Sequence, residues 1–309
     1  VDAFATLNVV DLLVDDDLTV TGDVAVTGDY SSTTSGTSNL RLGVNAGNSI
    51  ASGGNYNVVV GDEAGTALTT GDGNTAIGFE ALVTEDAHGN NTAVGYRSLK
   101  TLNAGADGFN TAVGYQSGTS MTTGIENTLI GSLAGDALTN SDFNVAVGVN
   151  ALSTDTLGSR TVAIGRETLF AQNFTTATDT YNVAVGYRAG AAVTTGLKNT
   201  LIGGLAGDSL TTNGLNVAVG YGSLSTEDTG SRNVAIGVSA LSSQNADTTN
   251  YNVAVGYNAG SAVTTGIQNT LIGGLAGDAL TDADGNVAVG RAALTTDTLG
   301  SQTVAIGSR

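Results

Sequence analysis

The sequence predicts an all-β fold in which parallel strands stack into a β-solenoid, or β-roll, with coils of about 17 residues. A five-residue core of the form Asn-(Val/Thr)-Ala-(Val/Ile)-Gly, or a close variant, occurs sixteen times in 309 residues. Twelve of the fifteen intervals between core glycines are 17 or 18 residues. The chain also has 45 Gly and no Pro. That composition suits coils whose backbone N–H groups donate to a neighbouring coil, because Pro has no N–H.

Each core predicts one short strand, because branched residues alternate with small ones. In the copy from Asn144 to Gly148, Val145 and Val147 share one face of the strand, whereas Ala146 lies on the other. We expect the Val face to fill the interior of the coil. The Ala/Gly face has no bulk, so we expect it to let the backbone of a second chain approach closely.

The core Asn opens nearly every strand in the same register. Stacked Asn side chains can hydrogen-bond to one another along a column, so we expect a structural ladder. Thr161 and Thr303 stand where Asn would precede Val, and both belong to the fourth coil of a group of four.

Two kinds of coil alternate in pairs. In the first kind a Gly lies four residues after the core Gly and an apolar residue lies seven after it, as with Gly190 and Val193. In the second kind the apolar residue already lies at the fourth place, as with Leu152. Two coils of each kind make a super-repeat of 70 to 72 residues, present four times. Three enlarged segments mark the boundaries between super-repeats and are expected to protrude into solvent: 100–109, 170–181 and 242–251.

The chain is predicted to have two parts. Residues 1–38 contain a six-residue repeat with Thr-Gly-Asp turns and a Ser/Thr-rich stretch, and we expect an N-terminal β stem and linker. Residues 39–309 are expected to form the sixteen-coil shaft of four super-repeats. A coil of this size is small for a free-standing solenoid, and together with the bare Ala/Gly face it predicts a multimer in which chains close on one another.

Composition excludes several classes of partner. Ten Lys and Arg against 28 Asp and Glu give a net charge of -18, which opposes binding to nucleic acid or to an anionic membrane. The chain has no Cys, so disulfides and thiol chemistry are excluded. No apolar run approaches the roughly 20 residues of a membrane span, and no targeting peptide is recognisable.

Few residues could support chemistry. His88 is the only histidine, so neither a Ser/His/Asp arrangement nor a histidine metal cluster can recur along the repeats. Asp136, Asp208 and Asp278 recur in Leu-Ala-Gly-Asp turns, where Asp caps backbone N–H groups, with calcium binding as the alternative. They are three or four coils apart, too far to act as a carboxylate pair on one bond. We predict no catalytic residue, cofactor or metal ligand.

The repeats resemble those of two protein families. The segments Asn110-Thr-Ala-Val-Gly-Tyr-Gln116 and Asn252-Val-Ala-Val-Gly-Tyr-Asn-Ala-Gly260, followed by Thr-Thr-Gly, resemble the NTAIGYxAL-type repeats of phage tail-fibre-like proteins. The core from Asn233 to Gly237 is also similar to the head repeat of YadA-type trimeric adhesins, which form a parallel β-roll trimer. The coil is longer than the adhesin repeat, and no chaperone domain, coiled-coil stalk or membrane anchor is recognisable. The resemblance implies a trimeric surface fibre.

We therefore expect a structural fibre and adhesion module without catalysis, on a virion tail or otherwise extracellular or at a cell surface. The first interpretation is the shaft of a phage tail fibre that contacts the host, joined to an anchoring protein at its N-terminal end. A bacterial trimeric adhesin or other extracellular fibre is the alternative. A glycan-depolymerising tailspike is a further one, and it would need a cleft with paired carboxylates.

In a shaft of similar coils, specific receptor contact must come from what does not repeat. Segment 170–181 is the longest enlarged segment and carries aromatic rings beside amide, hydroxyl and carboxylate groups. This mixture suits a host surface glycan or protein. The candidate receptor-facing residues are Asn173, Phe174, Asp179 and Tyr181.

Overall fold

The computed structural model describes residues 35–308. Most of the predicted N-terminal stem and linker therefore lies outside the described residues, and residues 35–38 form bends. The described part is all strand and turn, and none of its segments is a helix long and apolar enough to cross a membrane. The strands are β1 (Leu40–Leu42), β2 (Val58–Val60), β3 (Thr75–Ile77), β4 (Thr92–Val94), β5 (Thr111–Val113), β6 (Thr128–Ile130), β7 (Val145–Val147), β8 (Gly158–Ser159), β9 (Val162–Ile164), β10 (Thr178–Asp179), β11 (Val183–Val185), β12 (Thr200–Ile202), β13 (Val217–Val219), β14 (Val234–Ile236), β15 (Val253–Val255), β16 (Thr270–Ile272), β17 (Val287–Val289) and β18 (Val304–Ile306).

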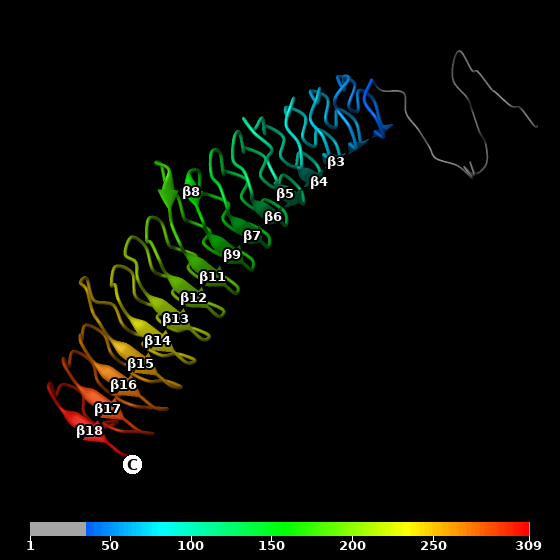
Figure 1. The fold of residues 1–309 in the computed structure, drawn as a ribbon. Helices are drawn as coiled ribbons and strands as arrows, with labels where there is room; N and C mark the ends of the chain where they lie inside the picture. The colour runs from blue at the N-terminus through cyan, green and yellow to red at the C-terminus, as the bar shows by residue number, and fades with distance from the viewer. Residues whose placement is uncertain (1–34, 309) are drawn as a thin grey trace, which may run out of the picture. The chain divides into compact units, whose positions relative to one another are not determined.

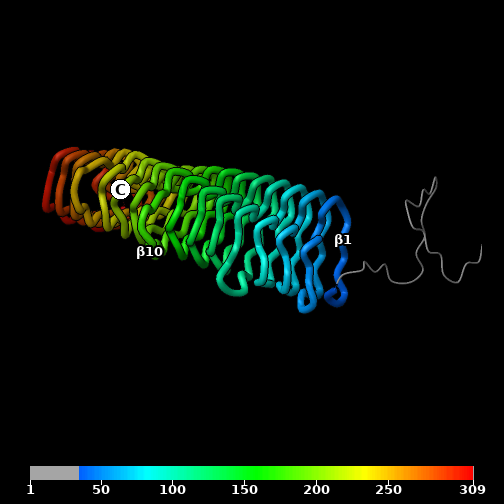
Figure 2. Tube along the Cα trace, turned by 90° about the horizontal axis from the view of Figure 1, so that it is seen from above, coloured from blue at the N-terminus to red at the C-terminus, as the bar shows by residue number. Residues whose placement is uncertain are grey.

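Sixteen of these strands form one sheet in chain order, one strand from each predicted coil. Every pairing is parallel and joins equivalent residues, for example Ala146 with Ala163. The prediction of a parallel β-solenoid with coils of about 17 residues is confirmed. β8 and β10 pair separately as a small second sheet. Successive coils lie side by side from residue 40 to residue 306 (Figures 1 and 2).

The two faces of each strand are the reverse of the sequence-based expectation. Ala146 is completely buried, whereas Val145 and Val147 face outward and are only half-buried. The prediction that the Val face fills the interior is therefore wrong. A 17-residue coil is narrow, and the small Ala leaves room for large side chains that reach across from the opposite wall.

Those large side chains avoid occupying the same space twice. In the coil of Ala146, the interior receives the fully buried Leu152 from four residues after the core Gly. Where the strand centre is Leu, as at Leu201, that place is Gly207, and a Cβ there would lie 2.8 Å from Leu201 Cδ2. A Gly at this place can also leave room for Leu side chains of neighbouring coils: a Cβ on Gly118, whose own strand centre is Ala112, would lie 2.8 Å from Leu129 Cδ1 and 2.9 Å from Leu99 Cδ2. Each fully buried Leu contributes about 2 kcal/mol by leaving water.

The Asn ladder is confirmed. The Asn182 side-chain oxygen accepts the backbone N–H of Asn199 at 2.9 Å, and the Asn199 oxygen accepts that of Asn216 at 3.1 Å. The Asn216 amide group also donates to the Gly230 carbonyl at 3.0 Å. The ladder therefore consists mainly of side-chain bonds to backbone groups, which satisfy polar atoms buried between coils.

The core glycines stack directly on one another. Gly186 has a φ of 134°, and a Cβ built on it would lie 2.6 Å from the carbonyl oxygen of Gly203. Positive φ and backbone contact both require Gly here. The close approach is to the next coil of the same chain.

Candidate functional site: enlarged loops and outer sheet face

A carboxylate occupies one place in each super-repeat, seven residues after the core Gly of its third coil. The four residues are Glu85, Asp155, Glu227 and Asp297, and the first three are fully buried. In the other kind of coil this place holds an apolar residue, so each carboxylate replaces a core side chain. Sequence reasoning missed this set, although its spacing follows the super-repeat.

Each fully buried carboxylate holds an enlarged segment of the next coil. Asp155 accepts backbone N–H bonds from Gly158 at 3.1 Å and from Phe174 at 3.0 Å, and a side-chain bond from Gln172 at 2.7 Å. Glu85 accepts the N–H of Ala104 at 3.1 Å in the same way. Burial raises the pKa of the Glu85 carboxyl, and these N–H bonds oppose that rise.

The enlarged segments consequently protrude only in part. Ala104, Phe174 and Ala246 are buried at equivalent places in the three segments, whereas the residues that follow them are largely exposed. The predicted protrusion holds for the tip of each segment. Its base is part of the core.

The four predicted receptor-facing residues divide into two pairs. Phe174 is only 6% exposed, so its ring is not free for a partner, whereas Asn173 is half-buried and accepts a hydrogen bond from the Thr156 hydroxyl at 3.0 Å. Asp179 and Tyr181 are exposed. The Tyr181 hydroxyl donates to Asp179 Oδ2 at 3.4 Å.

A surface cavity of about 420 Å³ lies beside Asp179. Phe143, Arg160 and Thr178 also line it. The Arg160 guanidinium stands 4.6 Å from the centre of the Phe143 ring, and its Nε lies 3.3 Å from Asp179 Oδ2. Pairing of β8 with β10 fixes the cavity's wall. It combines an aromatic edge with hydroxyl, carboxylate and guanidinium groups, which suits a polar ligand with many hydroxyls.

The outer face of the long sheet is apolar along its length. In the long sheet, the first residue of each strand from β2 to β18 is Thr or Val, and the third is always Val or Ile. The isoleucines of the third place stay 36 to 39% exposed within the stack, as at Ile77 and Ile202. A solvated sheet face normally carries polar residues, and contiguous apolar patches of more than a few hundred Å² mark interaction sites.

Exposed aromatic residues extend this face at both ends of the strands. The rings of Phe79, Tyr96 and Tyr115 stack on one another with centroids 5.5 and 5.3 Å apart. One row follows the core Gly and the other precedes the core Asn. Their members are Phe79, Tyr96, Tyr115, Tyr187, Tyr221 and Tyr257, and Tyr56, Phe109, Phe143, Tyr181 and Tyr251, respectively.

The recurring turn aspartates are separate from each other and incompletely paired. Asp136, Asp208 and Asp278 lie in the coils of β6, β12 and β16, and each has one buried carboxylate oxygen without a hydrogen-bond partner. Burial raises the pKa of Asp136 to about 6, and it raises that of Asp208 as well. In the first super-repeat the place is Thr66, whose hydroxyl donates to the Glu63 carbonyl at 2.8 Å. An acceptor-only carboxylate cannot reproduce that bond.

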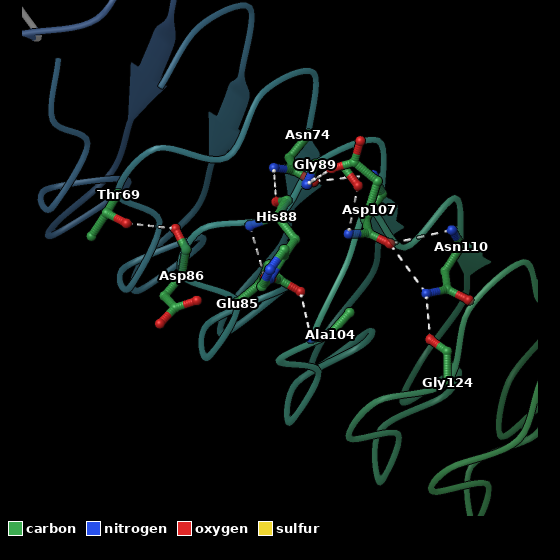
Figure 3. A network of polar contacts seen from close by, with 11 residues as sticks. Thr69, Asn74, Glu85, Asp86, His88, Gly89, Ala104, Asp107, Asn110 and Gly124 are labelled. Atoms are coloured by element: carbon green, nitrogen blue, oxygen red, sulfur yellow. Dashed lines mark hydrogen bonds and ion pairs between the residues drawn. The ribbon is translucent and has the colours of Figure 1, made fainter. Parts of the chain in front are cut away.

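One group of side chains has the composition of a metal site. Glu85, Asp86 and His88 each offer a ligand atom, and these atoms lie within 4.8 Å of one another. His88 Nδ1 is 3.3 Å from Glu85 Oε1 (Figure 3). The sequence analysis predicted no metal ligand because it treated His88 in isolation.

No protein-family model matches the chain, and neither a curated protein nor a solved structure matches it. We therefore infer its function from the sequence and the geometry described above.

Proposed function

We propose that the chain is the shaft of a homotrimeric surface fibre that carries adhesive contacts, with a phage tail fibre as the first assignment. The observation that supports self-association is the apolar outer face of the long sheet. The chain's net charge is -18, yet the outward places of the long-sheet strands from β2 to β18 hold no charged residue. A bacterial trimeric adhesin would use the same shaft with a different anchor.

The size of this face suits a stable assembly. Sixteen strands spaced about 4.8 Å apart make it roughly 70 Å long, and three residues give a breadth of about 10 Å. The resulting area is on the order of 700 Å² per chain, close to the roughly 800 Å² that each partner buries in a standard interface. A second copy of the chain is the natural occupant, since only another repeat of the same length can match the face coil by coil.

The aromatic rows favour three chains over two. A closed dimer would need one flat patch per chain. In a trimer each chain contacts two neighbours, so its apolar surface must extend beyond both ends of the strands. Exposed rings such as Tyr181 before the strand and Tyr187 after it provide that extension.

The adhesive contact is assigned to the cavity beside segment 170–181. Asp179 is its exposed member from the predicted set, and Arg160 and Phe143 complete the wall. We therefore propose that the contact lies in the groove that the segment forms with the preceding coils, and not at the buried Phe174. Hydroxyl-rich glycans or polar protein loops fit its mixture of groups.

Self-association is tested by placing charge on the outer face. The double variant Ile164→Lys and Val219→Lys carries two ammonium groups on outward-facing strand positions. The control variant Thr175→Lys and Thr248→Lys carries the same charge on exposed loop tips. Added positive charge lowers the net repulsion of an acidic chain, so a loss of assembly in the first variant reports contact at the face.

Sedimentation equilibrium is the measurement. We expect the native chain and the control to sediment at three times 30.5 kDa, and the outer-face variant as a folded monomer at the same concentration. Circular dichroism verifies that its strands remain. A native chain that sediments as a compact, cooperatively folded monomer would overturn the trimer.

A further inference from the structure

We propose that Glu85, Asp86 and His88 bind one divalent transition-metal ion, with Zn²⁺ as the best fit. The three ligand atoms already lie within 4.8 Å of one another. They comprise one imidazole nitrogen and two carboxylate oxygens, a donor set that Zn²⁺ accepts while keeping a position for water. The inference stands independently of trimer formation.

The sequence at this turn is unlike that of its three equivalents. The place of His88 is Gly158, Gly230 and Gly300 in the other super-repeats. In each of those turns the Gly N–H donates to the carboxylate three residues earlier, as His88 N–H does to Glu85 at 3.2 Å. A Cβ on Gly158 would overlap the Asp155 carboxylate. In the first super-repeat alone the turn accepts a side chain, and that side chain is the only imidazole of the chain.

The buried ligand is held in place before any ion arrives. The Glu85 side chain is 0% exposed, and its second oxygen accepts the N–H of Ala104 in the next coil at 3.1 Å (Figure 3). The His88 backbone is held as well, because its carbonyl accepts the Asn74 side-chain amide at 3.0 Å. A carboxylate and a turn fixed in this way lose little freedom on binding.

The distances fit a first coordination shell. Zn–ligand bonds of about 2.0–2.2 Å place two tetrahedral ligand atoms about 3.3 Å apart. The observed separation of His88 Nδ1 and Glu85 Oε1 is 3.3 Å. Asp86 lies at the surface and is at least partly exposed, so its carboxylate can rotate toward the ion without disturbing the core. His88 is 29% exposed, which leaves a path for the ion from solvent.

Binding would also join two coils. Glu85 belongs to the coil that follows β3, and through Ala104 it holds segment 100–109 of the next coil. An ion bound to Glu85 would keep this carboxyl group deprotonated and so favour the hydrogen bond that it accepts from the Ala104 N–H of that segment. Because the ligands must be deprotonated, affinity should fall as pH falls.

Isothermal titration calorimetry with zinc chloride on chelator-treated full chain tests the site. We expect one ion per chain for the native protein, and at least about tenfold weaker binding for Asp86→Asn. His88→Gly copies the turn of the other super-repeats, so it should fold normally and lose the site. Its melting temperature, measured without metal, verifies the fold.

Cobalt substitution gives a second readout, because Co²⁺ bound to nitrogen and oxygen ligands absorbs visible light according to its coordination geometry. Native protein should show a saturable band that His88→Gly lacks. The proposal is overturned if the native chain takes up no Zn²⁺ at roughly 1 mM, which would mean a dissociation constant weaker than about 1 mM. It is equally overturned if His88→Gly binds as tightly as the native chain, which would mean diffuse binding to acidic residues.

Discussion

The two sides of each coil follow different rules. On the strand side every strand of the long sheet has three residues, and its register never shifts over sixteen coils. On the opposite side the coil grows by up to four residues, and one core place holds Leu, Ile, Met, Val, Gln, Glu or Asp depending on the coil. The strand side is uniform because each strand pairs with the equivalent strand of the coil before it and of the coil after it. The loop side varies because each extra residue has only to satisfy its own polar groups.

The difference shows what each side contributes. Uniformity on the strand side sets the spacing and direction of the stack. Variation on the loop side is tolerated where a buried group compensates for it, as Asp155 does for segment 170–181. Structure is therefore most sensitive to substitution on the strand side and, on the loop side, only at these compensating groups.

The largest effect is expected from Gly186→Val on the strand side. A Cβ there would lie 2.6 Å from the Gly203 carbonyl, at a φ of 134° that side chains avoid. We expect a loss of about 4 kcal/mol or more in the free energy of unfolding. Gly105→Val in segment 100–109 is the matched control, because nothing lies within 4 Å of a Cβ there. Equal melting curves for the two variants would contradict the backbone-contact account of the core glycines.

A smaller loss is expected from Asp155→Ala on the loop side. It removes the acceptor for the N–H groups of Gly158 and Phe174 and for the Gln172 amide, all buried. Unsatisfied donors of this kind cost roughly 1–3 kcal/mol each before relaxation, so we expect a net loss of about 3 kcal/mol.

Asp297→Ala is the corresponding control. That carboxylate is partly exposed, with the single bond from Gly300 N–H at 2.8 Å, so we expect a loss of about 1 kcal/mol. Chemical denaturation measures both variants. If Asp297→Ala were the more damaging of the two, anchoring of the enlarged segment would not be the role of Asp155.

The smallest effect, of opposite sign, is expected from Asp136→Thr. The substitution copies Thr66, whose hydroxyl donates to a carbonyl three residues earlier. Burial raises the pKa of Asp136 from 3.8 to about 6. The protonated form is therefore favoured in the folded state, and its stabilising contribution is complete below pH 3.8 and is lost as the pH rises through about 6.

We expect Asp136→Thr to stabilise the chain by about 1 kcal/mol near neutral pH, after a discount for the partial exposure of the carboxyl. Below pH 3.8 the gain should disappear. Denaturant midpoints of variant and native chain across this range provide the test. A gain that is independent of pH would rule out the carboxyl's ionisation as the cause.

The repeat period, the parallel stacking and the Asn ladder could all be predicted because they depend on spacing and on backbone chemistry. Which face of each strand is buried could not be predicted. Alternation shows that Val145 and Val147 share a side, but which side is buried depends on the width of the coil and on what crosses from the far wall, here Leu152. The burial of Phe174 could not be predicted for a similar reason, because it depends on Asp155 in the preceding coil. His88 and Glu85 are three residues apart, yet their pairing required the geometry of the turn.

The ladder has a mechanical consequence. Every coil is bonded only to the coil before it and the coil after it, so a pull along the stack is carried as through springs in series, and the weakest joint yields first. At Thr161 the Asn is missing, and its hydroxyl contacts Thr180 at 2.7 Å while the Asn182 amide turns to Gln172 at 2.9 Å. Between β9 and β11 the backbone bonds of the sheet remain, such as that from the Val162 N–H to the Asn182 carbonyl at 2.9 Å, but the regular Asn bond to the next backbone N–H is replaced by bonds between side chains. We expect this joint between coils to separate first under load.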